Sequence, residues 1–254
     1  MIDLFITSLL LSVVLVGIHA YFGREIVKRG IIFTDIAVAQ FSGVGIALSL
    51  LFFNGEHTYL FSLAFGLFAS LLIALSQRIR EYTEAFIGLL YALGFSLTVL
   101  ILSLSPFGME ELKKITASDI LFVERHEVIK TALIYSLIGV FLYLRKYLKG
   151  LLGDLSFFAL FSLTLASSVE LVGVLVVFSL LVSPALISLL LKRGLVFAWV
   201  IGSFINLLAV SLSFLLDLPT GYAISFLHSL TGISVFLYKL AFKASSSSQK
   251  NSSL

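Results

Sequence analysis

The clearest evidence for the fold of this chain is the run Ser168-Val-Glu-Leu-Val-Gly-Val-Leu-Val-Val-Phe-Ser-Leu-Leu-Val-Ser-Pro-Ala185. It is apolar and of membrane length, yet it carries the carboxylate of Glu170 near its start and Pro184 near its end. A carboxylate is expensive in hydrocarbon, and a proline leaves a backbone carbonyl that another group must satisfy. Neither residue suits an inert lipid anchor, so the run predicts a helix inside a bundle that moves something across the membrane.

The composition of the whole chain agrees with this prediction. Hydrophobic residues make up 59% of the 254 residues and charged residues 12%, against about 25% charged in ordinary soluble domains. Apolar runs of roughly 20 residues, each able to cross a bilayer core of about 30 Å, recur along almost the whole length. The absence of cysteine excludes disulfides, thiolate metal ligands and thiol redox chemistry. The sequence therefore predicts an all-α, polytopic transmembrane helical bundle.

Residues 1–242 read as one membrane domain, followed by a serine-rich tail, 243–254, that we expect to be disordered and cytoplasmic. The stretch 155–191 is too long for one helix, and we expect a break near Ser167 and Ser168. Nine apolar spans result, with eight as the alternative if one segment is re-entrant. They are 4–23, 30–53, 59–76, 85–105, 131–144, two within 155–191, 195–216 and 222–242.

The distribution of basic residues supports nine spans with the amino terminus outside. Lysines and arginines stand in short clusters between the apolar runs, which is the pattern of the positive-inside rule and gives no sign of nucleic-acid binding. Nine spans place all of these clusters in the cytoplasm except the one in the long polar segment 106–130. Merging 155–191 into one span would export Lys192 and Arg193.

Five segments resemble, in the same order, signature motifs of the ABC-3 family, the membrane permeases of bacterial ABC importers for zinc, manganese and related divalent metals. They are Lys28-Arg-Gly-Ile-Ile-Phe-Thr-Asp-Ile-Ala-Val-Ala-Gln-Phe-Ser-Gly-Val-Gly45, residues 84–92, residues 117–123, residues 170–185, and Asp217-Leu-Pro-Thr-Gly221. The resemblance implies a permease like those of type II ABC importers in the bacterial plasma (inner) membrane, surrounded by lipid. It also implies a homodimer with the path between two copies, a separate ABC ATPase subunit, and an extracytoplasmic metal-binding protein.

The resemblance implies a metal role for Asp35, because family members usually carry Asp-x-x-x-His in the second helix, with both side chains on one helical face. Here position 39 is Ala39, and Gln40 follows it. An amide oxygen is a harder ligand than imidazole and suits Mn²⁺ better than Zn²⁺. We expect the transported ion to meet Asp35, Glu170, Gln40 and His19, of which His19 is expected to end the first span.

Each of these residues also has a plainer interpretation. Asp35 can be a first-turn charge at the membrane interface, and Glu170 can follow a helix start capped by Ser167-Ser168 or bond structurally to the second helix. His19 and His228 are more often satisfied bundle histidines than ligands.

The two remaining histidines, His57 and His126, are expected in exposed loops, where they could also pass metal from a delivery protein.

No enzyme signature is found. The chain has no Gly-rich phosphate loop with lysine, so ATP hydrolysis is expected in the separate subunit, and no permanently bound cofactor is expected. The cytoplasmic stretch 145–154 is shorter than the ATPase-docking segment usual in the family. The expected function is ATP-driven import of Zn²⁺, Mn²⁺ or Fe²⁺ by alternating access. The alternatives are a metal chelate or small organic cofactor as substrate, an ATP-independent channel or ion transporter, and a membrane scaffold.

Overall fold

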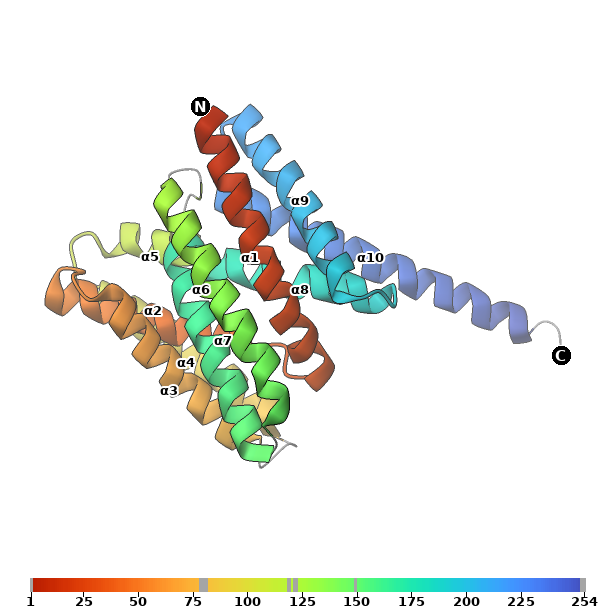
Figure 1. Ribbon diagram of the computed structural model, residues 1–254, viewed down its shortest axis with the longest axis horizontal. Helices are drawn as coiled ribbons and strands as arrows, with labels where there is room; N and C mark the ends of the chain where they lie inside the picture. The colour runs from red at the N-terminus through yellow and green to blue at the C-terminus, as the bar shows by residue number, and fades with distance from the viewer. Residues whose placement is uncertain (1, 78–81, 118–119, 121–122, 149, 252–254) are drawn as a thin grey trace.

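The computed structural model describes residues 2–77, 82–117, 120, 123–148 and 150–251, and within these residues it contains helices and no strands. Figure 1 shows the helices as one elongated bundle. In chain order they are α1 (Ile2–Arg29), α2 (Thr34–Phe53), α3 (Thr58–Ser76), α4 (Thr83–Leu102), α5 (Gly108–Thr116), α6 (Arg125–Leu144), the 3₁₀ turn η3 (Arg145–Tyr147), α7 (Gly150–Val172), α8 (Val174–Leu190), α9 (Leu195–Leu216) and α10 (Thr220–Asn251).

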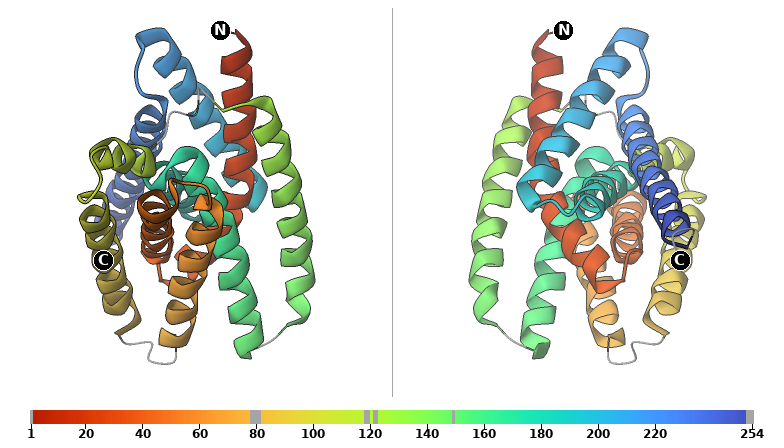
Figure 2. Two further views of the ribbon diagram at one scale, coloured as in Figure 1. Left: turned by 90° about the vertical axis from the view of Figure 1, so that its left-hand side faces the viewer. Right: turned by 90° about the vertical axis from the view of Figure 1, so that its right-hand side faces the viewer.

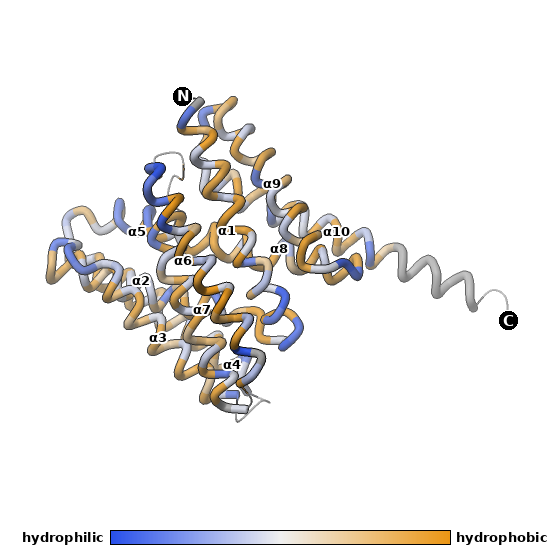
Figure 3. Tube along the Cα trace, viewed as in Figure 1, coloured by the Kyte–Doolittle hydropathy of each residue, from blue (hydrophilic) through white to orange (hydrophobic). Residues whose placement is uncertain are grey.

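Eight helices in the described part of the chain are long and apolar enough to cross a membrane: α1 to α4, α6, α7, α9 and α10. Hydrophobic residues run along them, and hydrophilic residues gather near their ends (Figure 3). The shorter apolar helix α8 has 17 residues, slightly fewer than the roughly 20 that a span along the bilayer normal needs. The prediction of a multi-pass helical membrane protein is confirmed, with eight full-length spans and α8 as a ninth apolar helix.

The chain breaks between α7 and α8 at Gly173, so the expected break near Ser167 and Ser168 is wrong. Both serine hydroxyls donate to the Thr164 carbonyl one turn earlier, at 2.9 and 2.6 Å, and such bonds let a serine stay inside a membrane helix. Gly173 has φ +83°, and a Cβ there would lie 2.7 Å from the backbone of Ala117. The break therefore needs the positive φ and the small size of glycine.

Two groups of helices pack around α6 and α7. In the first, α2 lies against α3 and α4, and α3 also packs on α7; in the second, α8, α9 and α10 contact one another and α1 packs on α8 and α9. Close backbone approach holds both groups together, since a Cβ on Gly45 would overlap the Phe61 carbonyl and one on Gly23 would overlap the Leu181 carbonyl. Figures 1 and 2 show α2 and α8 running across the bundle, at a steep angle to α6 and α7.

Two terminal segments differ from the expected bounds. The first span continues past residue 23 to Arg29, so His19 lies well inside α1 instead of ending it. At the other end of the chain the structure continues α10 to Asn251. Disorder of the serine-rich tail 243–254 stays a prediction.

Candidate functional site

Asp35 is a buried carboxylate in the first turn of α2, with 1% of its surface exposed. Among the described residues, neither of its oxygens accepts a hydrogen bond from another side chain. The amino terminus of a helix favours a negative charge, but an ionised carboxylate inside protein still needs a cation or several donors. Asp35 is thus a first-turn charge, as one interpretation held, but it lies inside the bundle and not at an exposed interface.

Ala39 and Gln40 stand on different sides of α2. Ala39 follows Asp35 by four residues, shares its face and is 1% exposed. Gln40 follows by five residues, about 140° around the helix from Asp35. It is half-buried, and its Cβ would lie 3.0 Å from a Cβ built on Gly94 of α4. The structure therefore separates Gln40 from Asp35, and a ligand role for Gln40 stays a prediction.

His19 is fully buried on α1 and presents a bare ring nitrogen. Its Nδ1 donates to the Leu15 carbonyl at 2.7 Å, which leaves the proton on Nδ1 and a lone pair on Nε2. Nε2 has no hydrogen-bond partner in the described part of the chain. The ring packs edge-on against Tyr135, with 6.3 Å between centroids, and Tyr135 is hydrogen-bonded to Ser167 and Ser168 on α7. This imidazole can accept a metal ion or a proton.

Glu170 lies near the carboxyl end of α7 and is exposed. The expectation that it follows a helix start is wrong, because α7 begins at Gly150 and ends at Val172. Glu170 borders two hollows, of about 330 and 210 Å³. Its carboxylate is thus open to water, unlike that of Asp35.

The four predicted metal residues do not come together. The smaller hollow at Glu170 also contacts Ile46 and Leu50 of α2. Ile46 follows Asp35 by eleven positions, which places Glu170 roughly 16 Å or more along the α2 axis from Asp35. The described residues contain no group of three or more His, Cys, Asp or Glu side chains that could hold a metal ion together.

A polar network lies inside the second helix group, and no pattern in the sequence predicts it. His228 is fully buried on α10, and its Nε2 lies 2.9 Å from Asn206 Oδ1 on α9. Asn206 Nδ2 donates to the Ser12 carbonyl at 3.1 Å, and Ser183 Oγ donates to the His228 carbonyl at 2.7 Å. His228 Nδ1 has no partner among the described residues. The network joins α1, α8, α9 and α10, as expected of a structural histidine.

His57 and His126 are both exposed, as predicted, although His126 lies in the first turn of α6 and not in a loop. His126 lies 3.1 Å from Glu124 and 3.2 Å from Glu127. The motif at 117–123 falls partly on residues 118–119 and 121–122, which lie outside the described residues.

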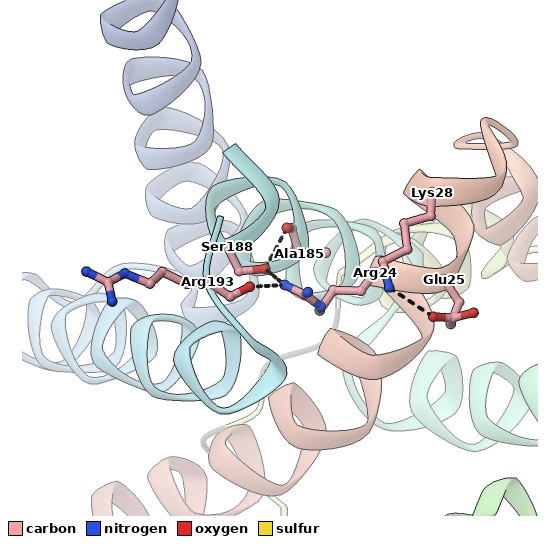
Figure 4. A network of polar contacts seen from close by, with 6 residues as sticks. All are labelled: Arg24, Glu25, Lys28, Ala185, Ser188 and Arg193. Carbon is pink, nitrogen blue, oxygen red and sulfur yellow. Dashed lines mark hydrogen bonds and ion pairs between the residues drawn. The ribbon is translucent and has the colours of Figure 1, made fainter. Parts of the chain in front are cut away.

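An arginine ties the carboxyl end of α1 to the turn between α8 and α9 (Figure 4). Arg24 donates to the Ser188 hydroxyl and to the Arg193 carbonyl, the latter at 2.8 Å. Nearby, Lys28 and Glu25 form an exposed pair at 3.4 Å. Arg24 joins α1 to other elements of the bundle, whereas the Lys28–Glu25 pair lies within α1. The bonds of Arg24 should therefore contribute more to the packing of the helices.

A second arginine-rich corner follows α6. Arg29 pairs with Asp154 at 2.9 Å, and Arg145 Nε donates to the Gly153 carbonyl at 3.1 Å. Both guanidinium groups lie over the Phe157 ring, 4.5 and 4.8 Å from its centroid. Among the described residues only η3 and Leu148 lie between α6 and α7.

Comparison with known proteins gives a consistent result. The chain is 25% identical to a Haemophilus influenzae protein named as an iron transport system membrane protein. The alignment of 266 positions covers 93% of this chain and 90% of that one. Among solved structures it matches PsaBC from Streptococcus pneumoniae in complex with Fab, with TM-score 0.72, 18% identity, and 93% and 95% of the two chains covered.

A second solved structure, described as an inward-facing metal-chelate type ABC transporter, matches with TM-score 0.65 and 19% identity, over 92% of this chain and 84% of that one. At these identities the structures show the fold. The model of the ABC 3 transport family matches residues 1–152 and 148–242. Since these residues make up most of the sequence, the chain belongs to the ABC 3 transport family.

Proposed function

We propose that this chain is the membrane permease subunit of an ATP-driven importer of divalent metal ions of the Zn²⁺, Mn²⁺ and Fe²⁺ class. The observation that carries the proposal is the carboxylate of Asp35, buried in an apolar bundle without a donor side chain among the described residues. A group of this kind is costly to keep in a membrane and is typical of an ion path. The relative named for iron transport supports the same substrate class.

In this proposal two copies of the chain alternate between outward and inward states, driven by separate ATPase subunits on the cytoplasmic side. Glu170 meets the ion at the outer end, where its carboxylate is exposed, and Asp35 meets it in the interior. The lone pair on His19 Nε2 is a third ligand candidate. Ligands that lie far apart suit transport, because a transported ion must leave each position as readily as it arrives.

A metal chelate is the second candidate substrate. It is favoured by the resemblance to a metal-chelate type transporter and by the alanine at position 39, which removes one ligand expected for a free ion. A chelate brings its own ligands and needs fewer from the protein.

Uptake into proteoliposomes tests the proposal. The chain is reconstituted with its co-encoded ATPase and binding protein, and Mn²⁺, Zn²⁺ and Fe²⁺ are offered free or chelated, with and without ATP. Elemental analysis should show ATP-dependent accumulation of a free ion. Accumulation of the chelated form alone would favour the second candidate, and equal accumulation without ATP would contradict an ATP-driven importer.

A further inference from the structure

The outer end of the bundle is acidic. Helix bounds and the positive-inside rule place the start of α1, both ends of α5, the start of α6, the end of α7 and the turn after α9 at this end. Acidic residues there outnumber basic ones two to one in the described part of the chain. The acidic ones are Asp3, Glu56, Glu110, Glu111, Glu124, Glu127, Glu170 and Asp217, and the basic ones are Lys113, Lys114, Arg125 and Lys130. Such a face attracts cationic groups.

Glu170 stands between two hollows of this face. The larger, about 330 Å³, is bordered by polar groups of three helices, α3, α6 and α7: Tyr59, Glu127, Lys130, Thr131, Ser167 and Glu170. The smaller, about 210 Å³, is bordered by Glu170 together with Thr58, Glu111 and Lys114. Each hollow thus holds one glutamate–lysine pair beside the shared Glu170.

The lysines of both hollows are already paired with glutamates of their own helices. Lys130 lies 3.1 Å from Glu127, and Lys114 lies 2.8 Å from Glu111. The bond to Glu111 raises the pKa of Lys114 above its ordinary value. Glu170 has no ion pair within 4.0 Å among the described residues. One negative charge therefore remains uncompensated between the hollows.

Thr131 supplies a second sign of a missing ligand. Its side chain is 3% exposed and borders the larger hollow, yet its hydroxyl has no hydrogen bond to any described residue. The hydroxyl of Tyr59 borders the same hollow. A hydroxyl has two acceptor lone pairs, so Thr131, Tyr59 and Glu170 together offer several acceptors in one place.

The chemistry of these acceptors suits a single positive charge with several N–H donors. A divalent ion that stays bound needs about four to eight ligands. Of the carboxylates that border these hollows, only Glu170 lacks an ion pair in the described part of the chain, which suits an ion in passing but not a resident one. A lysine ammonium has three donors and an arginine guanidinium has five, each with one positive charge. Either matches the one free carboxylate and the neighbouring hydroxyls.

We propose that the extracytoplasmic binding protein docks on this acidic face through lysine or arginine side chains, one of which inserts beside Glu170 into the larger hollow. The inference rests on the proposed function, since it assigns the docking contact of that importer. Inserted in the hollow, the basic side chain would donate to Glu170 and Thr131 and be shielded from water by α3, α6 and α7.

The inference is tested by a binding measurement. The permease–ATPase complex is placed in nanodiscs, and the affinity and dissociation rate of the metal-loaded, co-encoded binding protein are measured. Glu170→Gln keeps the shape and removes the charge, and it should weaken binding about tenfold or more, chiefly through faster dissociation, as loss of one partner of a shielded pair does. Thr131→Val should weaken binding by a smaller factor. Glu170→Lys should abolish binding, and a Lys or Arg to Glu change on the partner should restore it.

The control is Asp217→Asn, which removes an acidic charge from the turn after α9, where Asp217 has φ +52° and asparagine is tolerated. It should leave dissociation unchanged. Equal weakening by Asp217→Asn and Glu170→Gln would overturn insertion at Glu170, and so would binding that Glu170→Gln leaves unaltered. If uptake is ATP-dependent in those cases, the importer stands and only the docking contact fails. If the binding protein binds nowhere and no metal accumulates, the proposed function itself fails.

Discussion

The two carboxylates that we propose to meet the ion occupy opposite environments. Asp35 is enclosed at the start of α2, with 1% of its surface exposed, whereas Glu170 is exposed near the end of α7 and borders two hollows. Asp35 is enclosed by protein, where an ionised carboxylate needs a cation or several donors, so its proposed partner is the transported ion. The outer carboxylate has space and water beside it, so it can meet a side chain from another protein. In the two proposals the same chemical group thus serves two different steps.

The largest effect is expected from Asp35→Asn. The amide keeps the volume and removes the charge, so uptake should fall by more than about 100-fold. Loss of a residue that only supports a metal ligand already lowers metal affinity or activity by about 10- to 100-fold. Stability should stay within about 1 kcal/mol of wild type or rise, because removing an uncompensated buried charge is often neutral or stabilising. Uptake and thermal unfolding are measured on the same preparations.

Glu84→Gln is the matched control for Asp35. Glu84 is also a first-turn carboxylate, in α4, but it is exposed. Its neutralisation should leave uptake within about twofold of wild type, as surface substitutions usually do. Similar loss of uptake in both variants would show that burial does not distinguish the two positions.

The outer region should depend on the glycine that ends α7. Gly173→Ala places a Cβ against the Ala117 backbone at φ +83°, and we expect it to lower stability by about 2 kcal/mol or more. Gly88→Ala is the control, since a Cβ there meets nothing within 4 Å, and it should change stability by less than about 1 kcal/mol. Equal unfolding temperatures for the two variants would contradict the structure at the α7–α8 break.

The two buried histidines should separate transport from stability. His19→Ala removes the free Nε2 lone pair and should lower uptake per folded molecule about tenfold, the scale seen when a group that supports a metal site is lost. Because His19 is fully buried, the cavity should also lower stability by about 2 kcal/mol or more. His228→Ala leaves Asn206 Oδ1 without its donor and should cost about 1–3 kcal/mol of stability, with uptake per folded molecule unchanged. If His228→Ala lowered uptake per folded molecule and His19→Ala did not, the roles assigned to the two histidines would be wrong.

The smallest effects are expected at the carboxyl end of α1. Arg24→Ala removes the bonds from α1 to Ser188 and to the Arg193 carbonyl and should cost about 1 kcal/mol. Lys28→Ala removes an exposed pair on a single helix and should cost less than about 0.5 kcal/mol. Denaturation in the same detergent ranks the two, and a larger loss for Lys28→Ala would contradict the contacts in Figure 4.

Hydropathy was enough to predict the membrane helices, because each span is a nearly continuous apolar run. It misplaced the α7–α8 break, since Ser167 and Ser168 bond back to Thr164 and the break needs a glycine packed against a distant segment. The family motif led us to group Gln40 with Asp35, although a separation of five residues places a side chain on another side of a helix.

The contacts within the site could not be predicted from the sequence. His228 is bonded to Asn206 of a different helix. One hollow is bordered by three residues that are distant in the chain, Tyr59, Thr131 and Glu170. Only tertiary packing brings them together, and no local pattern signals it.

Counting bound metal shows whether Asp35 meets the transported ion. Wild-type and Asp35→Asn complexes in nanodiscs are equilibrated with the ion that is transported, and metal per protomer is measured by elemental analysis. We expect metal binding to saturate in the wild type and to be lost in Asp35→Asn, while the variant keeps its fold. Equal metal content in the two proteins would contradict it.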